Sequence, residues 1–239
     1  GFLFSDFRQI VASIAKEAKE AGVMIVTGDT KVVDSGKGDG IYINTAGIGF
    51  QRAVLPGKSG IKPGDAVLVS GTAGCHGAAV MMARSGLLRE DSPLRSDCRP
   101  LHLISSAALD AADEGDIRIL RDPTRGGLAT TLNEFTEGMP FSIVLDESSI
   151  PADPAVEAAC DMLGLDPLYC ACEGRMLAVC DSKAADDILR AVRAVPGGEN
   201  AARIGTVTES MPGKVLLRTP IGGRRILSKL SGMQLPRIC

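Results

Sequence analysis

The sequence of 239 residues predicts a mixed α/β protein, in which an antiparallel or mixed sheet carries helices on one face. Short apolar runs alternate with segments of helical periodicity, a pattern typical of strands interleaved with helices. Near the C-terminal end several expected strands follow one another without helices between them, which disfavours a doubly wound sheet. The 28 glycines and 13 prolines suit the many short connections of such a fold.

The first expected helix covers residues 5–22. Ser5 is the expected N-cap, apolar side chains recur at helical spacing, and Gly22 ends the segment. Two short apolar runs, 23–26 and 41–46, follow with a long polar loop between them. We expect both runs to form strands because apolar runs of this length, bounded by turn residues, are typical of buried strands.

The remaining elements are expected between residues 66 and 217, with short turns between them. Apolar runs predict strands over 66–69, 117–120, 142–145, 176–179, 202–207 and 215–217, and helical periodicity predicts helices over 76–84, 101–113, 127–135, 154–163 and 182–195.

Charge and composition exclude several classes of function. The chain has 26 Lys and Arg against 29 Asp and Glu, a net charge of −3, so nucleic acid is not an expected partner. No apolar run approaches the roughly 20 residues that a membrane helix needs, so we expect no membrane association. The start lacks the pattern of a secretory signal, and the seven cysteines are scattered. We therefore expect a soluble protein of the reducing cytoplasm.

A first polar cluster follows the run 23–26. Gly28 gives the backbone freedom, while Asp29, Thr30 and Lys31 supply a carboxylate, a hydroxyl and an ammonium group in sequence. Such a set can hold Mg²⁺ and phosphate together. The alternative is a polar turn in which Asp29 caps the backbone.

A second polar cluster, residues 121–127, lies just before the helix expected over 127–135. The free N–H groups and the positive dipole end of a helix attract phosphate, and glycine lets the backbone approach it closely. The candidate binding residues are Asp122, Thr124, Arg125, Gly126 and Gly127, with Asp122 as a second Mg²⁺ ligand. The alternative is a helix-start loop that is capped by Asp122 or Thr124.

The cysteines leave two interpretations open. Cys170 and Cys172 are expected to place two thiols on one face of a strand, and His76 beside Cys75 could complete a metal site, although zinc prefers C-x₂-C spacing. Free cysteine is more commonly a small buried hydrophobe. That second interpretation is expected for Cys98, Cys160, Cys170, Cys172 and Cys180.

Two further residues are candidates for chemistry. Glu173 comes at an expected strand start, just before Arg175, where it is either a buried general base or an ion-pair partner of an arginine. Cys239 is the last residue of the segment 228–239, which we expect to be a mobile tail. Such a thiol could be carried into an active site as a tethered substrate.

Three motifs together resemble the HypE family, the carbamoyl dehydratases of [NiFe]-hydrogenase maturation. They are residues 28–33 (GDTKVV), 121–134 (RDPTRGGLATTLNE) and 236–239 (PRIC), and the resemblance extends over nearly the whole chain. It implies the two-domain architecture of the AIR synthetase (PurM-like) superfamily. The implied division is a remainder of the N-terminal ATP-binding and dimerisation domain over 1–54, a C-terminal α/β domain over 55–227 and a flexible tail over 228–239.

The resemblance also implies a reaction. A HypF-type carbamoyltransferase places a carbamoyl group on Cys239, ATP activates the carboxamide oxygen, and loss of that oxygen leaves a thiocyanate. The cyano group then goes to iron on a HypC–HypD scaffold. Asp29 and Asp122 are expected to hold Mg²⁺ against the ATP phosphates, while Lys31 and Glu173 are expected to serve activation and proton removal.

The chain departs from the family pattern at two places. Family members begin with a further ATP-binding segment before the residue that matches Gly1, so we expect a truncated N-terminal domain. In a Gly-x-x-Gly-Asp-His-Gly loop the family has an aspartate where this chain has Cys75, and the neighbouring His76 stays a candidate catalytic residue. A homodimer is the expected assembly.

Two alternative functions stay open. One keeps the superfamily fold but activates another oxygen with ATP, as in selenophosphate or thiamine-phosphate chemistry, and it leaves the PRIC ending unexplained. The other is a non-enzymatic maturation scaffold or metallochaperone that uses Cys239 together with Cys170 and Cys172.

Overall fold

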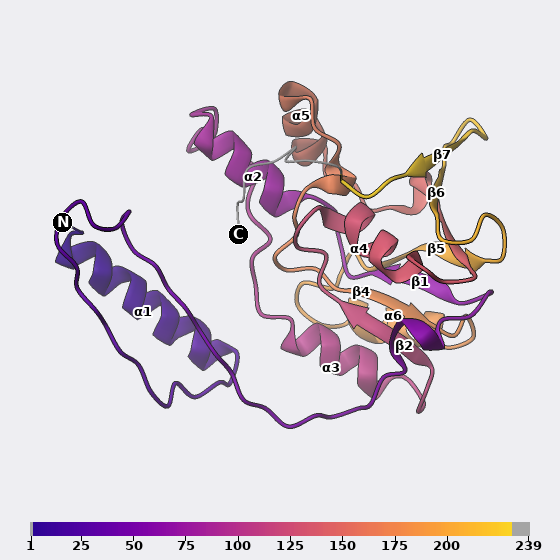
Figure 1. The fold of residues 1–239 in the computed structure, drawn as a ribbon, viewed down its shortest axis with the longest axis horizontal. Coiled ribbons are helices and arrows are strands. Elements are labelled where there is room, and N and C mark those ends of the chain that lie inside the picture. The colour runs from indigo at the N-terminus through magenta and orange to yellow at the C-terminus, as the bar shows by residue number, and fades with distance from the viewer. Residues whose placement is uncertain (1, 231–239) are drawn as a thin grey trace. The chain divides into compact units, whose positions relative to one another are not determined.

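The computed structural model describes residues 2–230 (Figure 1). The chain divides into two compact units, one that ends at Arg52 and one that begins at Ala53. Cys239 and the rest of the PRIC motif lie outside the described residues.

The first unit contains the helix α1 (Phe4–Glu20), which confirms the first expected helix. The expected N-cap is wrong: the helix is preceded by Leu3, without a side-chain cap, and the Ser5 hydroxyl donates instead to Asp6 Oδ1 at 3.1 Å. Ser5 already lies inside the first turn, two residues beyond the N-cap position from which a hydroxyl can cap the helix.

The strands expected over 23–26 and 41–46 do not form among the described residues. Both segments are extended but have no neighbouring strand in a ladder, and apolar side chains such as Val26 and Ile43 are exposed. An apolar run forms a strand only when a partner strand accepts its backbone hydrogen bonds. None of residues 2–52 is buried within the described chain.

The second unit is built on one mixed sheet of seven strands, in the order β2-β4-β1-β5-β3-β6-β7. Neighbouring strands are antiparallel except β3 and β6, which are parallel. The strands are β1 (Ala66–Val69), β2 (Ile117–Arg121), β3 (Ser142–Asp146), β4 (Leu177–Cys180), β5 (Ala202–Thr208), β6 (Val215–Arg218) and β7 (Arg224–Leu227). All were expected except β7, and the mixed α/β class is confirmed.

The helices of this unit also match the expected ones to within a few residues. They are α2 (Cys75–Arg84), α3 (His102–Asp110), α4 (Gly127–Thr136), α5 (Pro154–Leu163) and α6 (Ala185–Arg193), with the short 3₁₀ helices η1 (Gly57–Gly60), η2 (Glu147–Ser149) and η3 (Pro167–Tyr169).

Helices cover both faces of the sheet, not one face as expected (Figure 1). On one face, Val67 packs in a cluster with Leu128 of α4. On the other face, Leu68 packs in a cluster with Ile104 of α3 and Ile188 of α6. The reason is that β1 and β4 are buried at every position, and a strand that is apolar on both sides needs a layer on each side.

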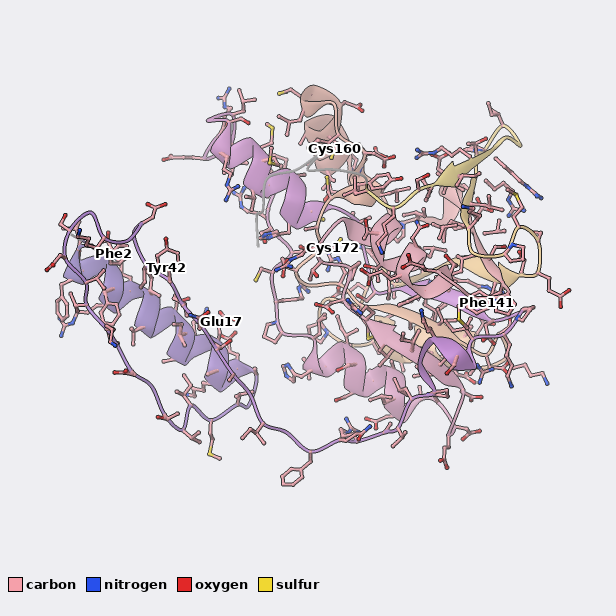
Figure 2. The ribbon with its side chains drawn as sticks, in the orientation of Figure 1. Phe2, Glu17, Tyr42, Phe141, Cys160 and Cys172 are labelled. Atoms are coloured by element: carbon pink, nitrogen blue, oxygen red, sulfur yellow. The ribbon has the colours of Figure 1, made fainter. Side chains whose placement is uncertain are left out.

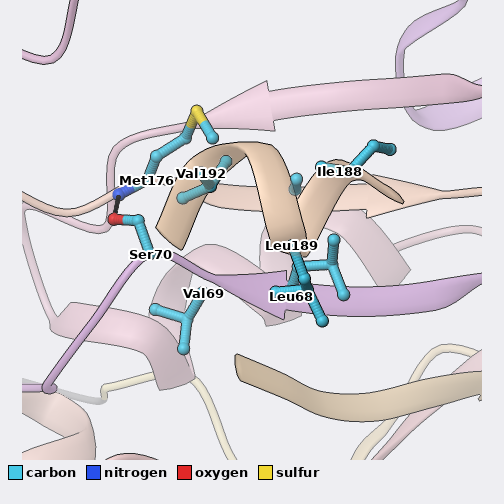
Figure 3. A pocket seen from close by; sticks show the side chains of 8 residues that line it. Leu68, Val69, Ser70, Met176, Ile188, Leu189 and Val192 are labelled. Atoms are coloured by element: carbon cyan, nitrogen blue, oxygen red, sulfur yellow. Dashed lines mark hydrogen bonds between the residues drawn. The ribbon is translucent and has the colours of Figure 1, made fainter. Parts of the chain in front are cut away.

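The core of the second unit is closely filled. Fully burying a leucine or phenylalanine side chain contributes about 1.5–3 kcal/mol, and Phe141, labelled in Figure 2, is buried against the α4 face of the sheet. Figure 3 shows a small cavity of about 10 Å³ between β1 and α6, lined by apolar side chains such as Leu68 and Leu189. A cavity this small and apolar does not hold a ligand.

No helix among the described residues combines the length and the apolar character that crossing a bilayer requires.

Candidate functional site

Two helices of the second unit begin in the same unusual way. The N-cap of α2 is Gly74, with φ 77°, and the N-cap of α4 is Gly126, with φ 72°. Both glycines are in the left-handed region that glycine adopts without strain, and neither helix start has a side-chain cap. Their first-turn N–H groups are therefore available to other partners.

One segment, residues 167–173, joins these two helix starts. The Gly77 N–H donates to Ala171 O at 2.9 Å, and the Cys172 N–H donates to Pro123 O at 3.1 Å. The segment thus contacts the loop before each helix. We call residues 71–77, 121–130 and 170–175 the helix-start site.

Glycine is required where the segment crosses α4. A Cβ atom on Gly127 would lie 2.5 Å from Cys170 O and 2.6 Å from Leu168 O, closer than a carbon atom can approach. The two glycines of the predicted pair share the same two uses. Both have a left-handed φ, 72° at Gly126 and 60° at Gly127, and both leave space that a Cβ atom would overfill.

The start of α2 is closed by a side chain from the joining segment. The Gly74 N–H donates to Cys172 Sγ at 3.1 Å, and a Cβ on Gly74 would lie 2.7 Å from Pro167 O. Burial raises the pKa of Cys172 to about 12, so its sulfur is a neutral thiol that fills this helix end.

The start of α4 is open in one respect: the loop that leads into it is largely exposed, whereas residues 71–75 at the start of α2 are all buried. Arg125 is exposed, and the Asp122 side chain is 55% exposed with its Oδ1 3.9 Å from Arg121 Nε. Thr130 Oγ1 lies next to Gly126, where it would be 2.2 Å from a Cβ on that glycine, and it is buried without a hydrogen-bond partner. The proposed alternative of a cap by Asp122 or Thr124 is wrong, because α4 has no side-chain cap.

Unpartnered polar atoms gather in and beside the helix-start site. Within residues 2–230, the buried side-chain atoms without a hydrogen-bond partner are His76 Nε2, Asp97 Oδ2, Thr130 Oγ1 and Glu173 Oε1. A buried polar atom without a partner costs about 1–3 kcal/mol, so such atoms are rare in folded proteins. A ligand that supplied partners would remove this cost.

Asp97, Arg175 and Ser96 hold the two proton-transfer candidates in place. Asp97 Oδ1 accepts the Glu173 N–H at 3.1 Å, and His76 Nδ1 lies 2.8 Å from Ser96 Oγ. Asp97 Oδ2 is 3.5 Å from Arg175 Nε, an ion pair without hydrogen-bond alignment because that Nε donates to Thr72 O at 3.0 Å. Glu173 precedes β4 by a bend rather than beginning the strand, so its side chain is not fixed by the sheet alternation.

The family's aspartate has no charged replacement here. Burial, followed by the Asp97 carboxylate, raises the pKa of Cys75 above its ordinary value, so Cys75 is a neutral thiol. It brings no negative charge to the start of α2.

The predicted site residues fall into three groups. Asp122, Thr124, Arg125, Gly126, Gly127, His76 and Glu173 lie together in the helix-start site. Gly28, Asp29, Thr30 and Lys31 lie in the first unit, in an extended, exposed segment where Asp29 Oδ1 accepts the Thr30 N–H at 2.8 Å. Cys239 lies outside the described residues.

The cysteine prediction is corrected in two respects. Cys170 and Cys172 are not in a strand, and they pack into different hydrophobic clusters. Cys170 lies beside Cys160, at an Sγ–Sγ distance of 3.8 Å. Cys98 is exposed rather than buried. Across the part of the chain that the structure describes, no group of three or more His, Cys, Asp or Glu side chains could hold a metal ion.

The sequence analysis missed Asp97, Arg175 and Thr130 as members of the site. Asp97 is far from Glu173 in the sequence, and Thr130 is inside a helix, where a hydroxyl is ordinarily bonded to the preceding turn. The signal in the sequence for Arg175 is Glu173-Gly174-Arg175, where a glycine stands between two charged residues. In the structure, a Cβ atom on Gly174 would overlap Asp97 O, which explains this glycine.

Comparison with known proteins identifies relatives over the whole chain. The family model of the AIR synthase related protein, C-terminal domain, matches residues 62–217. Carbamoyl dehydratase HypE of Cupriavidus necator is 51% identical over 240 residues, which cover 100% of this chain and 68% of the relative.

Two solved structures add information about ligands and partners. A structure of the hydrogenase maturation protein HypE in complex with ATP has a TM-score of 0.84 and 39% identity, covering 100% of this chain and 72% of that one. A structure of a HypE–HypF complex has a TM-score of 0.82 and 36% identity, covering 95% of this chain and 73% of that one.

Proposed function

The chain belongs to the HypE family of carbamoyl dehydratases, and we propose that it uses ATP to convert a carbamoyl group on its own Cys239 to a thiocyanate. The product supplies cyanide ligands for the iron of [NiFe]-hydrogenase. The observation that carries the proposal is the open start of α4, where an unpartnered Thr130 hydroxyl lies within the same site as His76 and Glu173.

The reaction removes the oxygen of a primary amide. The carboxamide oxygen takes the γ-phosphoryl group of ATP, which turns it into a leaving group, and ADP is released. Loss of two protons from the nitrogen and departure of phosphate then leave the nitrile of Cys–S–C≡N. The balance is one ATP consumed for one ADP and one phosphate, with no change of oxidation state.

The start of α4 fits the phosphates of ATP. Gly126 lets the backbone turn without a side chain, the helix has no side-chain cap, and Arg125 is exposed beside it. Thr130 Oγ1 can donate to a phosphate oxygen, which would remove its unsatisfied state. Similarity to a HypE that was solved with ATP supports this choice.

Mg²⁺ is proposed at the carboxylates of Asp29 and Asp122. Mg²⁺ is ordinarily held by one or two carboxylates and substrate phosphates, so each proposed aspartate ligand needs the nucleotide to complete the coordination of the ion. Both carboxylates are exposed. The ion pair of Asp122 with Arg121 is long, at 3.9 Å, so it competes only weakly with a bound cation. The ion would supply positive charge against the phosphate oxygens.

Glu173 is the proposed general base for the amide protons. Its Oε1 is buried without a partner, so the carboxylate is available to take a proton, and Asp97 accepts a hydrogen bond from the Glu173 backbone N–H. His76 Nε2 is likewise unpartnered and is proposed to share the proton transfer, with Ser96 orienting the ring through Nδ1. Lys31 is proposed to assist activation from the first unit.

The proposed partners follow from the same family. A HypF-type carbamoyltransferase donates the carbamoyl group, which similarity to the HypE of a HypE–HypF complex supports, and a HypC–HypD scaffold receives the cyano group. We also propose a homodimer formed through the first unit, because apolar side chains such as Val26, Ile48 and Phe50 are exposed there. The free thiols of buried cysteines suit a reducing cytoplasm.

The test is to follow the mass of Cys239 in the full-length protein. Exposed thiols are carbamoylated with cyanate in the absence of ATP, the reagent is removed, and ATP with Mg²⁺ is added. Peptide mapping of the C-terminal peptide should show a carbamoyl adduct that loses one water only after ATP is added. The variant Glu173→Gln should keep the adduct and lose the dehydration.

An adduct on Cys239 that stays intact with ATP and Mg²⁺ would contradict the dehydratase. The variant Cys98→Ala is a matched control, because Cys98 is the exposed thiol of the described chain and its loss should leave the reaction at Cys239 unchanged.

A further inference from the structure

The base of the C-terminal segment, residues 227–230, is held by side chains of α4 and η3. Asn133 Nδ2 donates to Leu227 O at 2.8 Å, and the Tyr169 hydroxyl donates to Ser228 O at 2.9 Å. Lys229 Nζ lies 3.3 Å from a Glu137 carboxylate oxygen. The backbone just after β7 is therefore bonded from two sides.

The two groups that bind this backbone are themselves braced. Asn133 Nδ2 also donates to Ala129 O at 2.8 Å, one turn earlier in α4. Asp166 begins the turn that carries Tyr169, since its Oδ1 accepts the Leu168 N–H at 2.9 Å, and its Oδ2 accepts from Arg225 of β7 at 2.9 Å. Donors that are already fixed lose less entropy when they bind.

The Tyr169 hydroxyl keeps its proton at neutral pH and so stays a hydrogen-bond donor. Burial, followed by the Asp166 carboxylate, raises the pKa of Tyr169 above its ordinary value, so the phenol stays protonated at neutral pH. A protonated phenol can donate to the Ser228 carbonyl, whereas a phenolate could only repel it.

The anchored base ends at the start of α4. Leu230 Cδ1 lies 3.1 Å from the position of a Cβ on Gly126, the N-cap of that helix. Cys239 follows nine residues later, since 239 − 230 = 9. Nine extended residues span at most roughly 30 Å, so a chain of this length that leaves the anchored base is long enough to return to the adjacent helix start.

We propose that Tyr169 and Asn133 are positioning residues, which hold residues 227–230 beside the start of α4 and thereby deliver Cys239 to the nucleotide site at that helix end. This inference rests on the proposed function. It assigns these two side chains to the intramolecular step, in which the carbamoyl group must reach the ATP bound by the same chain.

The physical effect is on effective concentration. A tethered group meets its site at a concentration that the tether's starting point and length set, and a fixed starting point near the site keeps it high. Releasing one anchor lets the base of the tether move away. Loss of one neutral hydrogen bond shifts the bound-to-released ratio by about fivefold, so the intramolecular rate should fall by up to about fivefold.

The test separates delivery of the tail from the chemistry of the site. In the first assay, full-length protein carbamoylated on Cys239 is mixed with ATP and Mg²⁺, and the loss of water is timed by peptide mapping. In the second assay, protein that lacks residues 231–239 acts on a synthetic peptide of those residues whose cysteine is carbamoylated. Both assays are run on the wild type, Tyr169→Phe, Asn133→Ala and Thr219→Val.

Thr219→Val is the matched control. Thr219 Oγ1 donates to Gly223 O at 3.2 Å, so this variant also removes a hydroxyl-to-carbonyl bond from the β6–β7 hairpin, but at the end away from Ser228. It should change neither assay.

The expected result is a slower first assay for Tyr169→Phe and Asn133→Ala, by up to about fivefold each, with an unchanged second assay. Equal rates in the first assay would overturn the inference, and so would an equal loss in both assays, which is the result expected if these residues only stabilise the fold. A wild-type protein that dehydrates in neither assay would instead overturn the proposed function.

Discussion

The starts of α2 and α4 are built on the same backbone plan and end in opposite states. Each begins at a left-handed glycine without a side-chain cap, and each packs on residues 167–173. At α2 the Gly74 N–H is taken by the Cys172 sulfur, whereas at α4 the Thr130 hydroxyl is left without a partner.

The difference shows that side chains from elsewhere in the chain decide whether the N–H groups of a helix start are bonded within the protein or can bind a ligand. The stretch 170–172 supplies a thiol and the Ala171 carbonyl to α2, whereas at the start of α4 it places only the Cys170 carbonyl against Gly127. The N–H groups at the start of any helix attract an anion. Because the Gly74 N–H at the start of α2 is already bonded to a thiol, the start of α4 is the better candidate for anion binding.

The largest expected effect comes from adding a side chain at Gly127, where α4 packs closely against residues 167–173. Gly127→Ala should lower the free energy of unfolding by about 2–5 kcal/mol, because its Cβ would overlap backbone carbonyls of the joining segment and its φ of 60° is strained for alanine. Urea unfolding measures this.

Gly138→Ala is the matched control, because Gly138 has φ 73° and open space around it. This variant adds the strain of a positive φ without any steric overlap, so it should lower the free energy of unfolding by about 1–2 kcal/mol. Equal losses for the two variants would mean that the close crossing at Gly127 is not what holds the α4 start against the joining segment.

A smaller effect on stability, with a clear effect on ATP, is expected at the open helix start. Thr130→Val should leave the free energy of unfolding unchanged or raise it, because it removes a buried hydroxyl that has no partner. The same change should weaken ATP binding by roughly 10- to 100-fold, the loss expected for a hydrogen bond to a charged group. Calorimetric titration measures the affinity.

Thr131→Val is the neighbouring control with the reverse expectation. Thr131 Oγ1 donates to Gly127 O at 3.0 Å, so its loss should lower stability and leave ATP affinity unchanged. If both threonine variants lose ATP affinity equally, the hydroxyl beside Gly126 has no special part in binding.

The effect that is smallest at neutral pH concerns the closed helix start, and it grows above pH 9. The unfolded Cys172 thiol ionises near 9.0, while the folded one is held neutral to about 12 by burial. Below pH 9 the thiol is neutral in both states and contributes no pH dependence. As the pH rises from 9 toward 12 the unfolded state alone loses its proton, so the free energy of unfolding falls by about 1.4 kcal/mol per pH unit.

Cys172→Ala should therefore flatten the fall of unfolding free energy over this window, as measured by urea unfolding at several pH values. Burial likewise raises the pKa of Cys180 to about 12, so Cys180→Ala should flatten it by a similar amount, and the double variant by the sum. An unchanged slope in Cys172→Ala would show that the thiol at the start of α2 is open to water.

The sequence predicts the fold best where both faces of a segment are apolar. The runs that became β1 and β4 are short and wholly buried, and they were assigned correctly. The similar run 23–26 has no partner strand among the described residues and stays exposed. The strand β7 was missed because it is an edge strand. Only Leu227 is buried in it, and exposed residues such as Arg224 and Arg225 interrupt the apolar pattern. Pairing, which no local pattern encodes, decides these cases.

Part of the candidate site could be singled out from one short motif. Gly126 and Gly127 stand in the segment before α4, where the structure places the start of that helix, and their part in binding stays a prediction. Asp97 and Thr130 could not be recognised, since their part in the site depends on contacts with residues distant in the sequence or on a bond that is missing. Three-dimensional proximity and unsatisfied polar atoms are visible only in the folded chain.

The most direct test of the central claim is to follow the backbone amides of the two helix starts by NMR while ATP and Mg²⁺ are added to the full-length protein. The account predicts large shifts, and slower hydrogen exchange, for the amides of Leu128 and Ala129 at the start of α4, with small changes for those of Cys75 and His76 at the start of α2. Large shifts at α2 with an unaffected α4 would contradict it.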